Sequence, residues 1–346
     1  MFAYCLEKKL IEIFKNNRHR YLDEKTLLKE FGLAEELNLD TESDQDLERT
    51  IDILRLQGYE IDGDLTRGWI LISLPPDSLN YFELESALKT TFLGKCLFTY
   101  RIIGSTNATA KMLAETGAPD GSLLVAEEQR QGRGRFGNSW HSPAGGGIWA
   151  SLILRPGIKP AQLGSLVLLA SLSICLAIEE RTGFKPRIKW PNDLYLNDRK
   201  LGGVLCEADW VGSELKYVIL GFGVNVNIKR FPAELENSAT SLLLAAKGKK
   251  VYRIGLLAEI MDRLEEGYFQ FLADGFASFL PRVQVRDYLR NRTVEIELDN
   301  SETVGGIARG IDERGALLLE TPGGQRFVKI TQGRVLHWKG SEIQTG

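Results

Sequence analysis

The sequence is poor in the residues that build disulfide frameworks and zinc sites. It has four cysteines and three histidines among 346 residues, and no two cysteines form a Cys-x-x-Cys pair. Widely spaced single thiols are typical of proteins in a reducing compartment, so we predict a cytoplasmic location. Three dispersed histidines argue against a zinc centre. Any metal ion is therefore expected to be a hard cation held by oxygen ligands and phosphates.

Long apolar stretches are also scarce. The longest run, from Leu166 to Ile178, has 13 residues and includes two serines. A membrane-spanning helix needs about 20 apolar residues, so this run predicts a buried helix and no membrane association. Three charged residues lie within the first ten positions, where an export signal needs an uninterrupted apolar stretch. We therefore expect no export signal at this end.

Charge is distributed unevenly along the chain. The chain carries 43 Lys and Arg against 46 Asp and Glu, a net charge of −3. Residues 1–80 hold 10 basic and 17 acidic residues, a balance of −7, and the remaining residues have a balance of +4. This asymmetry predicts separate modules with separate partners. The acidic first segment is poorly suited to binding nucleic-acid phosphates.

The first 80 residues have the outline of a small helical domain. Apolar residues recur at helical spacing over residues 4–15, 24–31 and about 43–58, and Gly32 is placed to end the second helix. Short β-prone runs follow at residues 59–61 and 68–72. Three small helices and a hairpin predict a winged helix-turn-helix.

The rest of the chain predicts two further parts. A mixed α/β core has strands expected at 123–125, 148–154 and 218–226, and helices at 107–115, 162–181 and 254–271. From Arg292 apolar residues alternate, at 294–298, 316–319 and 327–330, with glycines expected to turn the chain at 305–306, 315 and 323–324. Short alternating strands predict a small antiparallel barrel of about 50 residues.

The densest chemical signal is the segment Gln129–Gly137, in which glycine and arginine alternate directly after a predicted strand. Glycines let the backbone approach an anion, and arginines offer planar donors matched to phosphate or carboxylate. The spacing is neither that of a P-loop nor that of a dinucleotide fold. An ordinary solvated loop is the alternative, so this segment alone predicts anion binding and nothing more specific.

Two further segments carry polar residues on turns or strands. Lys189-Trp-Pro-Asn-Asp-Leu194, followed by Asp198–Gly203, could neutralise a triphosphate and hold Mg²⁺. A hairpin with ordinary surface charges is the alternative. In Gly221-Phe-Gly-Val-Asn225, the glycines of a predicted strand indicate close approach by a ligand.

Taken together and in order, five motifs resemble those of biotin–protein ligases. The motifs are Ser105-Thr106-Asn107, Gly132-Arg133-Gly134-Arg135, Lys189-Trp190-Pro191-Asn192-Asp193, Arg199-Lys200-Leu201-Gly202-Gly203 and Gly221-x-Gly-Val-Asn225. The resemblance covers residues 83–338. With the predicted winged helix ahead of it, the chain is similar to the bifunctional form that doubles as the biotin operon repressor.

The resemblance implies an α+β multidomain enzyme. Its parts would be a winged-helix domain at 1–80, a class II synthetase-like mixed α/β ligase core at 83–288 and an SH3-like β-barrel at 289–340. The implied reaction joins biotin to ATP, with Mg²⁺, as biotinyl-5′-AMP. Biotin then passes to a lysine of a biotin carboxyl carrier protein domain.

Site residues are carried over motif by motif. Those implied to bind biotin are Ser105, Thr106, Asn107, Gln129, Arg133, Gly134, Arg135, Lys200 and Gly203. Those implied to bind ATP are Arg135, Trp140, Lys189, Asn192 and Asn225. Lys200, Arg135 and Lys189 would carry catalysis, and Asp193 would help to hold the metal ion.

Two other classes of protein stay open at this point. A lipoate or octanoyl transferase of related fold is disfavoured by the combined Lys-Trp-Pro-Asn-Asp and Gly-Arg-Gly-Arg motifs. A biotin-responsive repressor would share the same core. However, relatives that repress usually begin the recognition helix with a Ser-Arg pair, whereas the segment Asp40–Asp52 holds six acids against the single base Arg49. We therefore expect poor DNA binding, and a homodimer stays open.

Overall fold

The computed structural model describes residues 2–30, 42–75, 77–212, 214–321 and 327–339. The chain divides into two units, Met1–Phe82 and Glu83–Gly346, which are described separately.

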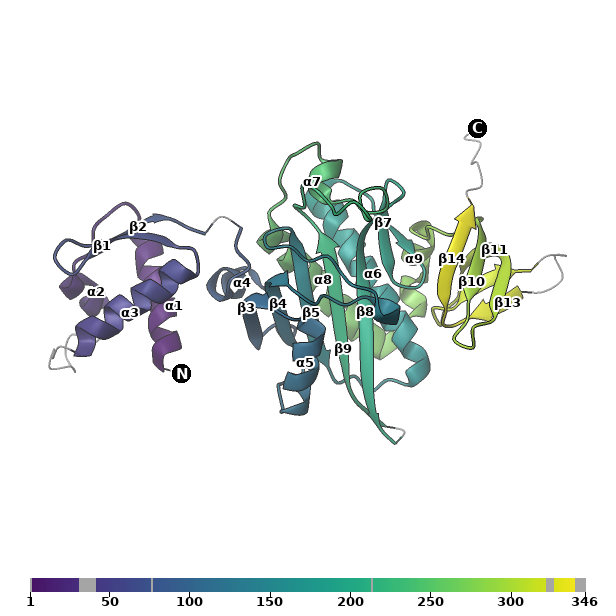
Figure 1. Ribbon diagram of the computed structural model, residues 1–346. Coiled ribbons are helices and arrows are strands. Elements are labelled where there is room, and N and C mark those ends of the chain that lie inside the picture. The colour runs from purple at the N-terminus through teal and green to yellow at the C-terminus, as the bar shows by residue number, and fades with distance from the viewer. Residues whose placement is uncertain (1, 31–41, 76, 213, 322–326, 340–346) are drawn as a thin grey trace. The chain divides into compact units, whose positions relative to one another are not determined.

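The N-terminal unit contains three helices and a hairpin, in the predicted order (Figure 1). The helices are α1 (Phe2–Asn16), α2 (Glu24–Glu30) and α3 (Glu42–Leu56), and β1 (Glu60–Asp64) pairs antiparallel with β2 (Gly68–Ser73). Phe14, Leu27, Ile51 and Trp69 meet in its buried core, so every element contributes an apolar face. The predicted helix stop at Gly32 lies outside the described residues.

The large unit is built on a seven-stranded mixed sheet. Its strand order is β3 (Leu97–Ile103), β4 (Ser122–Gln129), β5 (Gly147–Leu154), β9 (Glu214–Asn225), β8 (Arg199–Val211), β7 (Asp193–Leu196) and β6 (Arg187–Lys189). Only β3 and β4 run parallel among these described strands. The predictions at 123–125, 148–154 and 218–226 correspond to β4, β5 and β9. Strands β6, β7 and β8 lie in or next to the segment for which a hairpin was the alternative, and β3 was not predicted.

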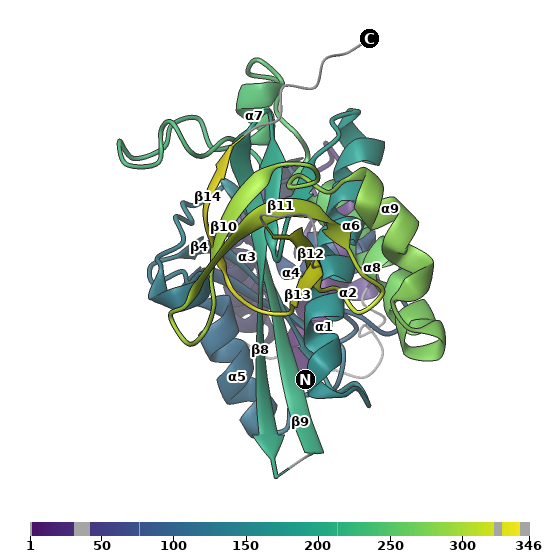
Figure 2. The same ribbon diagram turned by 90° about the vertical axis from the view of Figure 1, so that its right-hand side faces the viewer.

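Helices cover both faces of this sheet. Helix α5 (Thr106–Glu115) lies on one face, and α6 (Leu163–Thr182) and α8 (Arg253–Asp274) pack together on the other (Figure 2). All eight residues of β5 are consequently buried. The shorter helices are α4 (Tyr81–Ala87), α7 (Leu242–Ala245) and α9 (Leu280–Val285).

The prediction that the longest apolar run forms a buried helix is confirmed. Residues Pro160–Thr182 are long and apolar enough, by length and composition, to cross a membrane, yet 72% of the apolar window is buried inside the protein. The hydroxyls of Ser171 and Ser173 donate to the carbonyls of Val167 and Leu169 at 2.9 and 3.0 Å. Both serines are thus satisfied within α6, as a core helix requires.

The C-terminal part of the large unit is a five-stranded antiparallel sheet. Its order is β13 (Phe327–Ile330), β12 (Leu317–Glu320), β11 (Thr303–Ile311), β10 (Thr293–Glu297) and β14 (Arg334–Lys339). As predicted, Gly315 turns the chain, with a φ of +79° before β12.

The prediction of a turn at Gly305-Gly306 is wrong, because both residues lie inside β11. A Cβ on Gly306 would lie 2.4 Å from the carbonyl oxygen of Glu320. Glycine here therefore permits close strand packing rather than a reversal of the chain. The predicted turn at residues 323–324 lies outside the described residues.

Candidate active site

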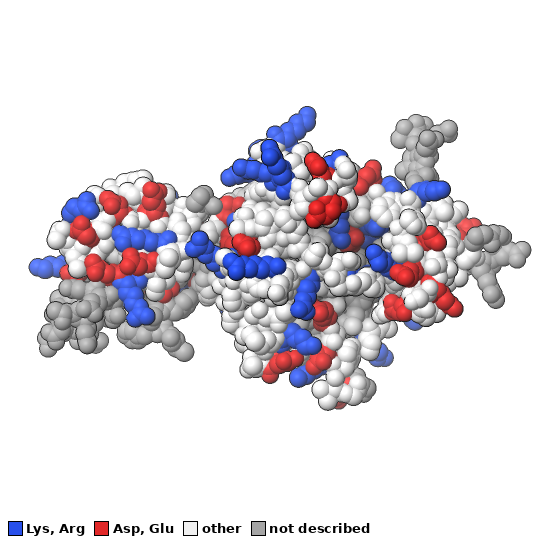
Figure 3. All heavy atoms as spheres, in the orientation of Figure 1, with Lys and Arg blue, Asp and Glu red and all other residues white. Residues whose placement is uncertain are grey.

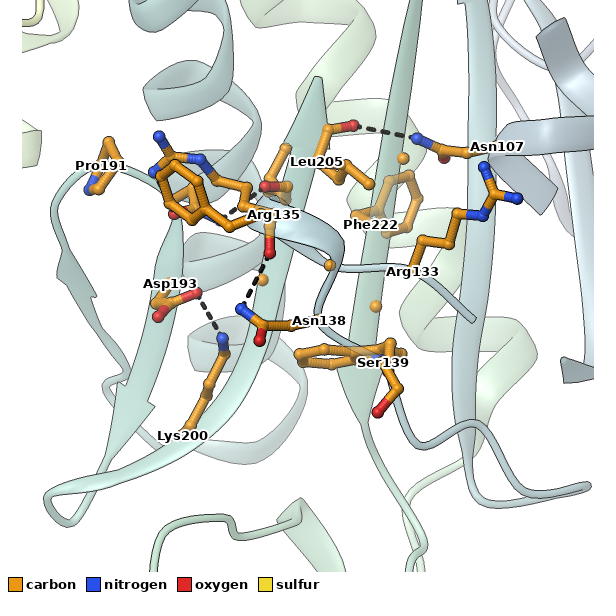
Figure 4. A pocket seen from close by; sticks show the side chains of 18 of the residues that line it. Asn107, Arg133, Arg135, Asn138, Ser139, Pro191, Asp193, Lys200, Leu205 and Phe222 are labelled. Atoms are coloured by element: carbon orange, nitrogen blue, oxygen red, sulfur yellow. Dashed lines mark hydrogen bonds and ion pairs between the residues drawn. The ribbon is translucent and has the colours of Figure 1, made fainter. Parts of the chain in front are cut away.

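A cavity of about 250 Å³ opens where α5, the glycine–arginine loop (residues 129–138), the β7–β8 hairpin and β9 converge. All of the predicted site residues except Asn225 line it. Figure 4 shows Asn107 and Arg133 at one end and the pair Asp193–Lys200 at the other. The cavity therefore joins motifs that are far apart in the sequence, from Ser105 to Gly223.

Hydrogen bonds fix the start of α5 against β4. Ser105 caps the helix by accepting from the backbone N–H of Ala108 at 3.4 Å. The N–H and hydroxyl of Thr106 lie 2.8 and 3.1 Å from Oε1 of Gln129. Gln129 in turn donates from Nε2 to Ser142 at 3.0 Å. This series of hydrogen bonds orients both polar groups of the Gln129 side chain at the cavity wall.

Asn107 is held by partners that the motifs did not indicate. Its Oδ1 accepts from the hydroxyl of Ser151 at 2.6 Å, and its Nδ2 donates to Glu207 at 2.7 Å. A Cβ on Gly221 would lie 1.9 Å from Oδ1 of Asn107. Gly221 therefore makes room for this amide.

The strand glycines were expected to mark the approach of a ligand; Gly221 and Gly223 line the cavity, and the expectation stays a prediction. Asn107 occupies the space over Gly221, and the indole of Trp140 lies over Gly223, where a Cβ would be 2.5 Å from Nε1. Protein side chains thus use the space that the glycines leave open, and they form the wall of the cavity.

Arg135 connects the glycine–arginine loop to the far side of the cavity. Its guanidinium donates to Oδ1 of Asn192 at 3.2 Å and to the carbonyl oxygen of Gly333 at 3.4 Å. Burial lowers the pKa of Arg135, and the negative charge of Asp193 opposes that shift. Arg133, by contrast, is exposed. The loop is therefore anchored by one arginine and leaves the other available.

The β7–β8 hairpin supplies a close ion pair. Nζ of Lys200 lies 2.7 Å from Oδ1 of Asp193, and Asn192 donates from Nδ2 to the carbonyl of Val204 at 2.9 Å. Gly203 pairs with Asp193 across the hairpin. Lys200 thus points into the cavity with its charge balanced by one carboxylate.

Lys189 is buried behind this pair. Its Nζ lies 3.6 Å from the ring centroid of Trp338 and 5.3 Å from that of Tyr195. Burial lowers the pKa of Lys189 to about 8, an effect that Asp193 opposes and Lys200 reinforces. A lysine with such a pKa changes its charge near physiological pH.

Asn225 lies in a neighbouring cavity of about 160 Å³, which shares Trp140 and Lys200 with the first. Its Nδ2 donates to the carbonyl of Thr240 at 3.1 Å. Nε1 of Trp140 is buried and has no hydrogen-bond partner in the described part of the chain. A buried donor without a partner suits a site that a ligand completes.

Asp193 fits the binding of Mg²⁺ only together with a substrate. Within the described ranges, no group of three or more His, Cys, Asp or Glu residues could hold a metal ion. Mg²⁺ usually keeps several waters and binds through one or two carboxylates and the phosphates of a nucleotide. A single carboxylate facing the cavity matches that pattern.

Several residues around the cavity were missed by the sequence reasoning. Arg334, Val335 and Trp338 come from β14, and Ser142, Ser151 and Glu207 orient the predicted residues. They are single residues outside any glycine-rich or charged motif, so no local signal indicates them. The packing of the C-terminal sheet and the pairing of β9 with β5 and β8 bring most of them to the site, and a bridge to Gln129 places Ser142 there.

The chain matches known proteins along most of its length. Residues 99–225 match the model of the Biotin/lipoate A/B protein ligase family, and residues 291–338 match the biotin protein ligase C-terminal domain. Fold and site thus define a protein ligase of that class. The second match and the relatives below identify the branch: the chain belongs to the biotin protein ligases. The predicted resemblance is confirmed, and the prediction of a ligase is confirmed with it.

Similar proteins include both regulators and dedicated enzymes. The chain is 35% identical over 323 residues to the bifunctional ligase/repressor BirA of Bacillus subtilis, covering 91% of this chain and 94% of the relative. It is 34% identical over 245 residues to the biotin–[acetyl-CoA-carboxylase] ligase of Mycobacterium tuberculosis, covering 68% and 86%. The biotin protein ligase of Aquifex aeolicus in complex with biotin and ATP superposes with a TM-score of 0.62 at 30% identity, covering 71% of this chain and all of that one.

Proposed function

We propose that this enzyme activates biotin with ATP and transfers it to a lysine of a biotin carboxyl carrier protein domain. The observation that carries the proposal is the pair of adjoining cavities that share Trp140 and Lys200. The larger cavity would take biotin, and the smaller would take part of the nucleotide. Lys200 would then stand where the biotin carboxylate meets the α-phosphate.

The biotin end of the site is made of hydrogen-bonding groups. The hydroxyl of Thr106 and the amide of Gln129 would contact the ureido group, with Ser105 and Asn107 beside them. Arg133 and Gly134 would close over the bound molecule, and Gly203 would leave room for its chain. Support comes from the fixed orientation of Gln129 between Thr106 and Ser142.

In the first half-reaction a carboxylate oxygen of biotin attacks the α-phosphorus of ATP. The bond from that phosphorus to the bridging oxygen breaks, and pyrophosphate leaves. Lys200 would stabilise the developing negative charge, and Lys189 and Arg135 would neutralise the polyphosphate. Such fixed cations need no reorganisation during the reaction.

The nucleotide would be held by side chains of both cavities. Trp140 would stack on adenine, with Asn192 and Asn225 nearby. Mg²⁺, which lowers the charge of the phosphates when it is bound with ATP, would be held in part by Asp193. Asp193 would have to leave Lys200 as the substrates enter. The same exchange would free the Lys200 ammonium for the reacting oxygens.

In the second half-reaction the neutral amine of the acceptor lysine attacks the carbonyl carbon of biotinyl-5′-AMP. A C–N bond forms, the C–O bond to AMP breaks, and the amine loses a proton to solvent. No nucleophilic side chain of the enzyme is needed, so the scarcity of histidine is no obstacle. The acceptor class follows from the relatives named biotin–[acetyl-CoA-carboxylase] ligase.

The proposal includes a domain organisation. Residues 1–80 form a winged helix, 83–288 a class II synthetase-like core and 289–340 an SH3-like barrel. The order of three helices and a hairpin, and the separate five-stranded sheet, support this division. A cytoplasmic location belongs to the same proposal.

The test is a reconstituted transfer. The full chain is incubated with ATP, MgCl₂, biotin and a biotin carboxyl carrier domain, and the mass of the carrier is measured by mass spectrometry. We expect one biotinyl group per carrier, and none when the acceptor lysine is replaced by arginine. Lipoate and octanoate, offered in place of biotin, are the competing substrates. Transfer of either in preference to biotin would overturn the assignment.

A repressor function is the second candidate, favoured by the relatives named bifunctional ligase/repressor that match almost the whole chain. We propose that the N-terminal unit here binds DNA weakly or not at all. Glu48 and Asp52 are exposed on α3, and Arg55 is engaged by Asp52 and by the carbonyl of Ile61. On the face seen in Figure 3, acidic and basic side chains alternate over this unit. This mixed surface lacks the single sign of charge that attracts a polyanion.

A further inference from the structure

The ammonium of Lys189 is buried without a carboxylate partner. Only 7% of the residue is exposed, and Asp193, whose charge attracts Lys189, forms its ion pair with Lys200 instead. No ion pair of Lys189 occurs in the described part of the chain. Burial of an uncompensated charge costs free energy, so other groups must make this position tolerable.

Two aromatic rings surround the ammonium, and we call Tyr195 and Trp338 the aromatic cage. Nζ of Lys189 lies 3.6 Å from the ring centroid of Trp338 and 5.3 Å from that of Tyr195. The two rings are 6.0 Å apart and nearly perpendicular, at 89°. The negative faces of aromatic rings attract a cation, most strongly when the cation is desolvated and the ring is tryptophan.

The aromatic cage is itself held in place. Tyr288 packs 4.7 Å from Tyr195 and 6.3 Å from Trp338, and the guanidinium of Arg292 lies 4.1 Å over the ring of Tyr288. Lys189 ends β6 and Tyr195 belongs to β7, whereas Trp338 lies on β14 of the five-stranded sheet. The cage therefore spans the boundary between the ligase core and the C-terminal sheet.

We propose that Trp338 is a positioning residue for ATP, holding the Lys189 ammonium at the polyphosphate end of the cavity. The inference rests on the proposed function, which gives Lys189 the polyphosphate. In this arrangement the C-terminal sheet sets the affinity for ATP. It leaves the affinity for biotin unchanged, because neither Trp338 nor Lys189 is among the residues proposed to contact biotin.

The first measurement compares the KM values for ATP and biotin in pyrophosphate release. A desolvated cation–π contact of about 1 to 2 kcal/mol corresponds to about a 5- to 30-fold change. We expect Trp338→Leu to raise the KM for ATP by that factor, with the KM for biotin within about twofold of wild type. Trp338→Phe, which restores a ring, should recover much of the loss. His337→Ala, an exposed neighbour on β14, is the control and should leave both values unchanged.

A double-mutant cycle with Lys189→Met separates positioning from general damage. If Trp338 acts through the ammonium, Trp338→Leu should add nothing to the KM for ATP once that ammonium is gone. Additive losses, or equal losses for ATP and biotin, would overturn the proposal. Should Trp338→Leu fail to fold, judged by circular dichroism, Trp338→Met replaces it in the cycle, because methionine fills space flexibly without an aromatic ring. An unchanged KM for ATP in that variant then counts against the proposal.

The same cycle distinguishes this inference from the proposed function. A Lys189→Met enzyme with an unchanged KM for ATP would refute both the role of Lys189 and that of Trp338. Transfer of biotin to the carrier domain would still establish the ligase reaction. Failure of transfer by the wild-type enzyme would instead refute the proposed function itself.

Discussion

Among single residues, Lys200 occupies the position on which the proposed chemistry depends most. Its ammonium is 2.7 Å from Asp193 and lines both cavities. Removal of one preorganised electrostatic contact to a transition state typically costs about 10²- to 10³-fold in rate. We therefore expect Lys200→Ala to lower pyrophosphate release by about that factor while the protein stays folded.

Stopped assays of pyrophosphate, with circular dichroism as the folding check, measure this. Lys216→Ala is a matched control, because Lys216 is an exposed lysine on β9 that pairs with an acid of the neighbouring strand β8, Asp209, at 3.8 Å. It should retain wild-type activity. A Lys200→Ala enzyme within a few-fold of wild type would contradict the role given to Lys200.

The second prediction at this level concerns pH. Burial lowers the pKa of Lys189 to about 8, so Lys189 is mostly charged at pH 7 and mostly neutral at pH 9. Contact with the polyphosphate is then lost as pH rises through 8, and the KM for ATP should rise over the same interval. In Lys189→Arg the guanidinium stays charged, so this rise should disappear. A wild-type KM for ATP that is flat from pH 7 to 9 would refute this prediction.

How far the sequence predicts the site depends on whether a residue lies in a motif. Lys189, Asp193 and Lys200 lie in short charged motifs at the ends of strands β6, β7 and β8, and all three line the cavity. Ser151 and Trp338 could not be predicted, because a lone serine in an apolar strand and a lone aromatic residue near the C-terminus have no local signature. Their roles arise from contacts with residues far away in the chain.

Among the structural elements, the glycine–arginine loop is the one whose behaviour matters most for function. It contains few apolar anchors, and Arg135 attaches it to Asn192 and Gly333. We expect Arg135→Ala to shorten the retention of biotinyl-5′-AMP more than it lowers thermal stability, because the loop loses that attachment. Gly134→Ser should act in the same direction.

Release of preformed adenylate, followed by gel filtration and by random labelling of bystander lysines, measures the retention. Arg130→Ala makes a suitable control. Arg130 is an exposed arginine of the same loop, and its contact with Glu128, at 3.8 Å, is long for an ion pair. If both loop variants hold adenylate as long as the wild-type enzyme does, the loop does not gate release.

Strand β11 offers a stability test with a built-in control. A Cβ at Gly306 would lie 2.4 Å from a backbone oxygen, whereas at Gly305 the nearest atom would be 3.9 Å away. We expect Gly306→Ala to lower the free energy of unfolding by about 1–3 kcal/mol, as overpacking does. Gly305→Ala should change it far less. Urea denaturation of the two variants measures both free energies of unfolding. Equal losses of stability would contradict the packing argument.

The elements themselves were predictable where the apolar pattern was long or regular. Helices α6 and α8 and strands β5 and β9 follow from their sequences. Strands β6 and β7 are too short to show a period, and β8 mixes glycine with charged residues. Strand β3, with Phe98, Tyr100 and two isoleucines, carried an aromatic and β-branched signal that could have been used. The glycine pair in β11 led to a wrong prediction of a turn, because glycine occurs where strands pack closely as well as in turns.

For the molecule as a whole, we expect that the N-terminal unit does not bind DNA specifically. Glu48 and Asp52 are exposed on α3, and in the predicted wing hydrogen bonds from Thr66 and Arg67 hold the pKa of Asp64 well below its usual range. Bound DNA would bring phosphates of like charge to these acidic side chains. We expect no sequence-specific shift of a biotin-gene promoter by the biotin- and ATP-loaded protein.

Titration at moderate salt against that promoter and an unrelated fragment provides the measurement. The double variant Glu48→Lys/Asp52→Lys should gain salt-dependent, non-specific affinity, because it exchanges two repulsive charges for attractive ones. A sequence-specific shift by the wild-type protein at nanomolar concentration would restore the repressor function.

The indole of Trp190 donates to the carbonyl of Gly315 at 3.0 Å. Trp190 lies between Lys189 and Asn192, so the β6–β7 connection, which carries two of the proposed nucleotide contacts, also fastens the C-terminal sheet. A ligand that binds only the folded site raises the free energy of unfolding of every segment that unfolds together with that site. Biotin and ATP should therefore slow amide hydrogen exchange in β12, a strand that supplies none of the proposed ligand contacts. Damage to that distant strand would conversely appear as premature loss of the activated intermediate.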